Sequence, residues 1–213
     1  MIFLGIDTSA QTASVAVCDE EKIIITASLN TGLTHSQTLL PMVESILSAS
    51  NMKLSDIDAF AVSNGPGSFT GIRIGVSAVK GFSYANNKPC AAVSTLEALA
   101  YNMQGFDGII CPVMDARRNQ VYNALFENGE RLCEDRAISI EELKAELEAY
   151  DKKIWLVGDG ADLVYNALKE ELNNINLAPI TLKTQLASSV CMCAKNKDLI
   201  SPQELLPSYL RLS

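Results

Sequence analysis

One succession of elements, three strands followed by a helix, a strand and a second helix, occurs twice in this chain of 213 residues. Short apolar or alternating runs predict the strands, and apolar residues spaced three and four apart predict the helices. The first copy has predicted strands at 2–8, 12–18 and 22–29, a helix at 34–50, a strand at 59–63 and a helix at 71–85. The second copy has predicted strands at 108–115, 120–127 and 131–138, a helix at 140–150, a strand at 154–157 and a helix at 161–172. The chain is therefore expected to contain two copies of one α/β unit.

The two copies also correspond at their starts. Asp7 ends the first strand of the first copy as Asp115 ends the first strand of the second, and a hairpin follows each. The segment 105–108, Gly-Phe-Asp-Gly, is the predicted boundary, so domains are expected at 1–105 and 106–213. A duplicated βββαβα unit resembles the layout of the actin, hexokinase and Hsp70-like (ASKHA) ATPase superfamily, and we expect that two-domain α/β fold.

Composition limits the function classes. Hydrophobic residues make up 48% of the chain, enough for a sizeable core, yet no apolar run reaches the length of a membrane span. The start lacks the basic segment of a signal peptide, so a cytoplasmic protein without membrane contact is expected. A net charge of −8 argues against independent RNA binding, which normally uses a basic surface. The six cysteines have no paired CxxC spacing and are expected to be reduced and packed in the core.

A glycine-rich loop separates the predicted strand at 59–63 from the helix that follows it. Residues 64–75 read Asn-Gly-Pro-Gly-Ser-Phe-Thr-Gly-Ile-Arg-Ile-Gly. This segment resembles the signature of the TsaB (YeaZ) family, whose members take part in bacterial biosynthesis of tRNA threonylcarbamoyladenosine. Further resemblance lies in Gly-Ile-Asp-Thr-Ser at 5–9, Thr-His-Ser at 34–36, Val-Ser-Thr-Leu-Glu-Ala-Leu-Ala at 93–100 and Pro-Ser-Tyr-Leu-Arg at 207–211.

The resemblance implies a non-catalytic subunit that acts in a complex. Its implied partners are a TsaD-like catalytic subunit and a TsaE-like ATPase, with tRNA reached only through the complex and a homodimer expected in isolation. TsaD-like relatives hold a metal with two histidines in a segment that corresponds to residues 94–99. Here Thr95 and Leu99 occupy those two positions, and leucine cannot bind a metal. No catalytic and no metal-binding residue is therefore expected.

Five residues are expected to retain a weak ATP or ADP site, although no cofactor should be required. Asp7 and Asp115 match the carboxylates that help to hold Mg²⁺ and phosphates in active members of the superfamily, and Thr8 adds a hydroxyl. Gly158 and Gly160 resemble the adenosine-binding turn, with Asp159 inserted between them. The hairpins after both aspartates contain no glycine, so tight ATP hydrolysis is not expected.

The resemblance also implies that two helices of the first half form the surface for self-association or for TsaD. Leu39, Val43 and Ile46 form an apolar stripe on the helix at 34–50. Gly71, Gly75 and Ala78 lie on one side of the next helix, where small side chains would let another helix approach. Packing of both stripes in the chain's own core is the alternative interpretation of these residues.

Two other functions stay open from the sequence. A small-molecule kinase or ATPase of the same fold would hydrolyse ATP by itself and depend on Asp7. A peptidase is the second alternative, and a metallopeptidase is disfavoured because His35 is the only histidine.

Overall fold

The computed structural model of the chain describes residues 1–210, which divide into two compact units. Unit 1 comprises Met1–Ala98 and Gln185–Ser208, and unit 2 contains Leu99–Thr184. The sequence placed the division at 105/106 and the whole of 106–213 in one domain. The structure instead groups 185–208 with unit 1, because the helix in that segment packs on the first sheet.

Unit 1 is built on a five-stranded sheet in the order β3-β2-β1-β4-β5. Its strands are β1 (Phe3–Asp7), β2 (Ala13–Cys18), β3 (Ile23–Leu29), β4 (Ala59–Gly65) and β5 (Cys90–Ser94). Its helices are α1 (His35–Ala49), the 3-10 turn η1 (Leu54–Asp56), α2 (Phe69–Asn86) and α6 (Ala187–Ala194). The first three strands are antiparallel, and β4 and β5 continue the sheet in parallel with β1. Helix α3 (Thr95–Tyr101) follows β5 directly.

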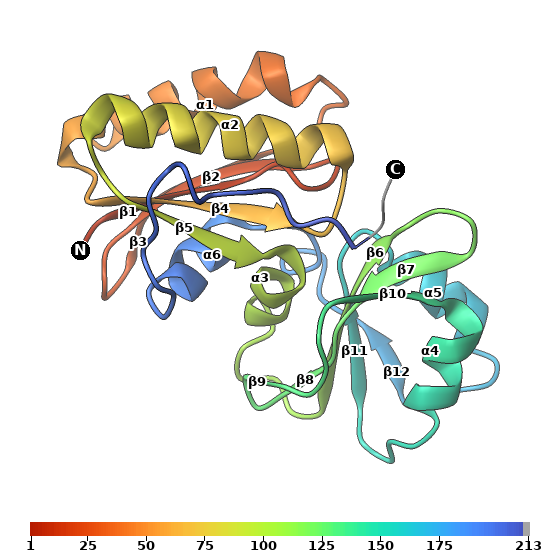
Figure 1. Cartoon of the computed structure of the whole chain (residues 1–213). Helices are drawn as coiled ribbons and strands as arrows, with labels where there is room; N and C mark the ends of the chain where they lie inside the picture. Colours follow the sequence, from red (N-terminus) through yellow and green to blue (C-terminus); the bar gives the residue numbers. More distant parts are fainter. Residues whose placement is uncertain (211–213) are drawn as a thin grey trace. The chain divides into compact units, whose positions relative to one another are not determined.

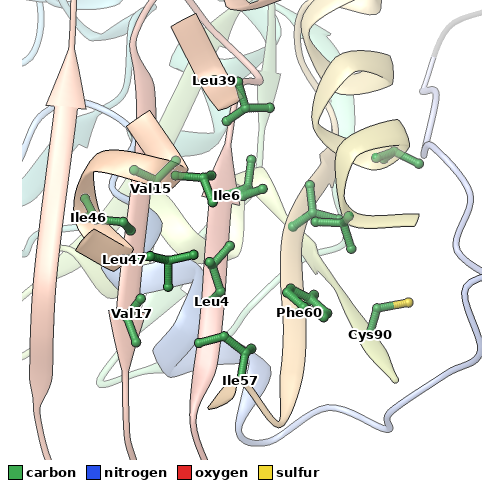
Figure 2. Close-up of a cluster of buried hydrophobic side chains, with 14 of the residues drawn as sticks. Leu4, Ile6, Val15, Val17, Leu39, Ile46, Leu47, Ile57, Phe60 and Cys90 are labelled. Atoms are coloured by element: carbon green, nitrogen blue, oxygen red, sulfur yellow. The ribbon is translucent and has the colours of Figure 1, made fainter. Parts of the chain in front are cut away.

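Helices cover both faces of this sheet (Figure 1), with α1 and α2 on one face and α6 on the other. The apolar residues of α1 recur at intervals of three and four, so one stripe of the helix meets the sheet. Figure 2 shows Leu39, Ile46 and Leu47 of α1 directed at side chains of β1 and β2, among them Leu4, Ile6 and Val15. On the opposite face, α6 lies so close to β1 that a Cβ on Gly5 would be 2.5 Å from the sulfur of Cys191.

Unit 2 repeats the strand order of unit 1. Its sheet runs β10-β7-β6-β11-β12, with the short β8 paired to β6 and β9. The strands are β6 (Ile109–Asp115), β7 (Gln120–Asn123), β8 (Phe126–Glu127), β9 (Glu130–Arg131), β10 (Arg136–Ser139), β11 (Ile154–Val157) and β12 (Ile175–Leu177). Helices α4 (Ile140–Leu147) and α5 (Ala161–Leu168) pack on the same core cluster. The expected duplication is confirmed: in each unit three antiparallel strands lead into two parallel ones.

Two local predictions were wrong, and one helix was missed. The strand expected at 120–127 divides into β7 and β8, which pair with different parts of the neighbouring strands. Ser201, Pro202 and Glu204 form the residue pattern of a helix start, which predicts a last helix there. Residues 201–204 instead form a hydrogen-bonded turn, in which Ser201 binds Glu204 as a capping residue would. The 187–194 helix was not predicted.

Candidate functional site

The carboxylate of Asp7 lies at the end of β1 and is completely buried. One of its oxygens accepts hydrogen bonds from the backbone N–H of Ser9, at 2.9 Å, and from the Ser9 hydroxyl, at 2.6 Å. The other oxygen accepts one from the hydroxyl of Ser63. Burial raises the pKa of Asp7 above the usual aspartate value, although the bonds from Ser63 and Ser9 oppose the shift. A phosphate-bound metal ion could reach this carboxylate only after these donors were displaced.

Thr8 is equally enclosed, because the start of α2 packs directly on it. Its hydroxyl donates to the carbonyl of Gly71 at 2.8 Å. A Cβ on Gly71 would overlap the Thr8 carbonyl oxygen, and one on Gly75 would lie 2.5 Å from Thr8 Oγ1. The two glycines of α2 are thus the residues that let the helix close over Asp7 and Thr8.

The second group of predicted nucleotide residues comes together in unit 2. Asp115 accepts hydrogen bonds from the N–H of Arg117, at 2.7 Å, and from its guanidinium, at 3.1 Å. A Cβ on Gly160 would stand 3.0 Å from the backbone nitrogen of Asp115. Gly158 has φ +113°, and a Cβ there would overlap the carbonyl oxygen of Val113. Close packing of the α5 start on β6 therefore accounts for both glycines, and Asp115 is bound to its own hairpin.

The segment 94–99, which by resemblance corresponds to the metal site of TsaD-like proteins, contains Ser94, Thr95 and Glu97 but no histidine. Thr95 and Leu99 are both buried, and Leu99 is 1% exposed. Within the described part of the chain, the buried hydroxyl of Thr95 has no hydrogen-bond partner. Across residues 1–210, no group of three or more histidine, cysteine or acidic side chains is arranged to hold a metal ion. All six cysteines are free thiols, and five of them are buried.

A groove runs between α1 and α2 on the side that faces away from the sheet. Its first part has a volume of about 570 Å³ and is lined by His35, Ser36, Leu39, Leu40, Phe69, Thr70, Arg73, Ile74, Ser77 and Ala78. A second hollow of about 400 Å³ continues from Leu40 and is lined by Val43, Glu44, Leu47, Ser48, Met52, Leu54 and Phe82. We call these two hollows together the α1–α2 groove.

Large apolar side chains stand exposed along this groove and beside it. Leu40 and Tyr84 are each 55% exposed and Phe69 is 41% exposed. The guanidinium of Arg73 lies 3.6 Å from the centroid of the Phe69 ring, a cation–π contact. His35, the single histidine, lines the groove and its Nε2 lies 2.7 Å from the carbonyl oxygen of Ala10.

The structure corrects the choice of partner-facing residues. Ile46, Gly71 and Gly75 are buried in unit 1 and point away from the groove. Leu39 and Val43 belong to the same core and contribute only to the groove floor. Of the six predicted residues, only Ala78 is a half-buried wall residue.

The residues that the sequence analysis missed are those on the outer side of α2. Phe69, Arg73, Ser77 and Gly81 are all exposed and follow one another at intervals of four. The signal was present, because the buried apolar residues Ile72, Val76 and Val79 share the side of Gly71 and Gly75. That side had to be the one that meets the sheet.

Comparison with known proteins gives consistent relatives. The family model for TsaD, tRNA N6-adenosine threonylcarbamoyltransferase, matches residues 30–205. The tRNA threonylcarbamoyladenosine biosynthesis protein TsaB of Bacillus subtilis is 32% identical over 100% of this chain and 95% of its own length. The solved structure of YeaZ from Pseudomonas aeruginosa has a TM-score of 0.83 and 26% identity, and covers 98% of this chain and 99% of that one. The ROK hexokinase of Thermus thermophilus, with a TM-score of 0.52 and 11% identity over 92% of this chain and 100% of that one, shares the fold alone.

The chain consists of two units with the same strand order, and its fold matches those of YeaZ and a hexokinase. It is therefore a two-domain α/β protein of the ASKHA fold. Within that class the chain belongs to the TsaB family of tRNA threonylcarbamoyladenosine biosynthesis proteins.

None of the helices within residues 1–210 has the length and apolar character needed to cross a bilayer.

Proposed function

We propose that this chain is a non-catalytic subunit of the assembly that forms threonylcarbamoyladenosine in tRNA. It would pair with a TsaD-like catalytic subunit through the α1–α2 groove and would act together with a TsaE-like ATPase in the cytoplasm. Its task would be to stabilise the active conformation of the catalytic subunit. The α1–α2 groove is the observation that carries this proposal.

The groove has the composition of a protein interface. Helices α1 and α2, of 15 and 18 residues, carry three charged side chains between them: Glu44, Arg73 and Lys80. Charged residues make up 20% of the whole chain, so this surface is depleted of them. Depletion of charge, with exposed aromatic residues and arginine, distinguishes the centre of interfaces from ordinary surface.

Charge also favours a particular kind of partner. The three charged groups of α1 and α2 sum to +1, whereas the chain as a whole carries −8. A partner with an apolar, neutral to acidic face would complement the groove, because opposed potentials steer association and like charges oppose it. A second copy of this chain could meet the same groove, and we propose that the isolated protein forms a homodimer there.

The closed environment of Asp7 supports a non-catalytic role. General-acid or metal-assisted chemistry needs a carboxylate that substrate or metal can reach, and Asp7 has its three hydrogen-bond donors within the unit. Nucleotide binding would then be weak and would fall on the Asp115 side, with no cofactor required for the role in the assembly. tRNA would be reached only through the partner.

Reconstitution tests the proposal. Threonylcarbamoyl transfer to unmodified tRNA would be measured with the catalytic subunit, the ATPase and the adenylate-forming enzyme, with and without this chain. We expect modification to require the chain, and the chain alone to hydrolyse neither ATP nor peptides.

A variant on the outer side of α2, one turn beyond the groove-lining Ser77, tests the partner-facing surface. Nothing lies within 4 Å of a Cβ placed on Gly81, so Gly81→Arg should leave the monomer folded and block the partner. Lys22→Glu, a charge change on an exposed turn of unit 1, is the control. Full activity without the chain, or vigorous ATP turnover that Asp7→Asn abolishes, would support the kinase or ATPase alternative instead.

A further inference from the structure

The last described stretch of the chain returns to unit 1 and follows its sheet edge and glycine loop (Figure 1, dark blue). We call residues 200–208 the C-terminal strap. Ile200 exchanges two backbone hydrogen bonds with Cys90 of the edge strand β5, at 3.0 and 2.8 Å. Leu205 is then fully buried in the core of unit 1, which anchors the middle of the strap.

The end of the strap binds the glycine loop at 64–68. The side-chain amide of Asn64 donates to the carbonyl of Leu206 at 3.0 Å, and the N–H of Ser208 donates to the carbonyl of Asn64 at 2.7 Å. The carbonyl oxygen of Ser208 occupies the space that a side chain on Gly65 would need. Gly65 also has φ +131°, a conformation that other residues rarely adopt. Two segments 142 residues apart in the chain thus form one contact.

The glycine loop in turn determines where α2 begins. On its other side the N–H of Ser68 donates to the carbonyl of Ser9 at 2.7 Å, so the loop is held from both sides. Ser68 is the N-cap residue of α2, and its hydroxyl accepts the N–H of Gly71. The next residue, Phe69, lines the α1–α2 groove and contacts Arg73.

We propose that the C-terminal strap is a positioning element for the partner-binding groove. By holding Asn64 and Gly65, it sets the start of α2 and with it the place of Phe69 and Arg73 in the groove wall. The strap residues themselves do not line the groove. This inference rests on the proposed function, because it concerns how well a partner fits.

Two variants remove the strap contact in different ways. Asn64→Ala removes the bond to the Leu206 carbonyl, and Ser208→Pro removes the N–H that binds the Asn64 carbonyl. Leu206→Ser is the matched control, since the Leu206 side chain is 63% exposed and its carbonyl is retained. Affinity for the proposed TsaD-like partner subunit would be measured by titration calorimetry, with each variant's folded state confirmed by circular dichroism.

We expect each of the two variants to weaken partner binding about fivefold, the effect of one lost hydrogen bond, and the control to match wild type. The double variant should lose less than the product of the single effects, because both changes act on one contact. Hydrogen exchange of the Ser68 amide in the isolated chain should become faster in both variants and stay unchanged in the control.

Separate outcomes identify which idea fails. If Gly81→Arg blocks the partner while Asn64→Ala and Ser208→Pro bind within twofold of wild type, the strap has no positioning role, even if both variants melt earlier. If Gly81→Arg and Leu40→Asp, whose side chain lines the groove, both leave binding intact, the groove assignment fails instead. In that case the exchange of Ser68 still decides the strap, and unchanged protection in both variants would overturn the link between strap and loop.

Discussion

Gly75 and Gly81 lie six residues apart in α2, and the same substitution should have opposite effects on stability at the two positions. Gly81 is exposed, and a Cβ there would contact nothing within 4 Å. Gly75 is buried, and a Cβ there would lie 2.5 Å from Thr8 Oγ1 and 3.2 Å from a methyl group of Val62. The pair therefore reports which side of α2 meets the sheet.

The magnitudes follow from helix propensity and packing. Gly→Ala in the interior of an exposed helix stabilises by about 0.8–1 kcal/mol, so Gly81→Ala should raise the melting temperature by roughly 2–4 °C for a chain of this size. Gly75→Ala gains the same propensity term but overpacks the sheet contact, which costs about 1–3 kcal/mol. It also displaces the Thr8 hydroxyl from the carbonyl of Gly71, a bond that contributes about 1 kcal/mol. A net loss of about 1–3 kcal/mol is expected.

Urea unfolding followed by circular dichroism measures both variants beside wild type. The midpoint should rise for Gly81→Ala and fall for Gly75→Ala, with an unchanged slope if only stability is affected. A destabilised Gly81→Ala together with a neutral Gly75→Ala would mean that α2 faces the sheet with its other side. The assignment of the partner-binding groove would then be wrong as well.

Three further results are expected from the same structure. Asp7→Asn should stabilise the protein at pH 8, because burial raises the pKa of Asp7 and its ionisation above that pKa disfavours the folded state. Unfolding measured over a range of pH should show this gain in stability shrink as the pH falls through the pKa of Asp7 in the folded state. In native thiol labelling, the half-buried Cys133 should react before the buried Cys111, because burial raises the pKa of Cys111 to about 12; labelling of Cys111 ahead of Cys133 would contradict its burial. On α1, Leu40→Asp should abolish partner binding and leave the fold intact, whereas Val43→Asp should unfold unit 1; a folded Val43→Asp monomer by circular dichroism would contradict the core assignment.

Much of the fold follows from local patterns in the sequence. Most strands and helices of both copies were predicted to within a few residues because their apolar spacing is regular. The strands expected at 120–127 and 131–138 are the exceptions, since each corresponds to two short strands. The pair Ser139 and Glu142 has the spacing of a capping box, and the box forms, with bonds in both directions. Thr34 and Gln37 have the same spacing at the start of α1, but the Thr34 side chain makes no capping bond.

Other features depend on contacts that no local pattern shows. Helix α6 consists largely of small residues and cysteines and is buried on nearly all sides, so it lacks the polar stripe by which a helix is identified. Its return to the first sheet is a long-range event, set by the close fit of Cys191 against Gly5. The contact between the strap and the glycine loop is also long-range. Both segments resemble family motifs, but neither motif shows that the two segments meet.

The burial of the predicted partner-facing residues and the enclosure of Asp7 and Thr8 have one shared cause. The sequence shows Asp7 and Thr8 at a strand end, where an open site would lie, and small residues on α2, where a partner could lie. In the structure the strand end and the small residues of α2 pack against each other, because Gly71 and Gly75 let α2 contact Thr8. The same packing that encloses the carboxylate turns Phe69, Arg73 and Gly81 outward. The orientation of α2, with its glycine side on the sheet, therefore has two consequences. It encloses Asp7, which argues against chemistry there, and it leaves the opposite side of the helix open to a partner.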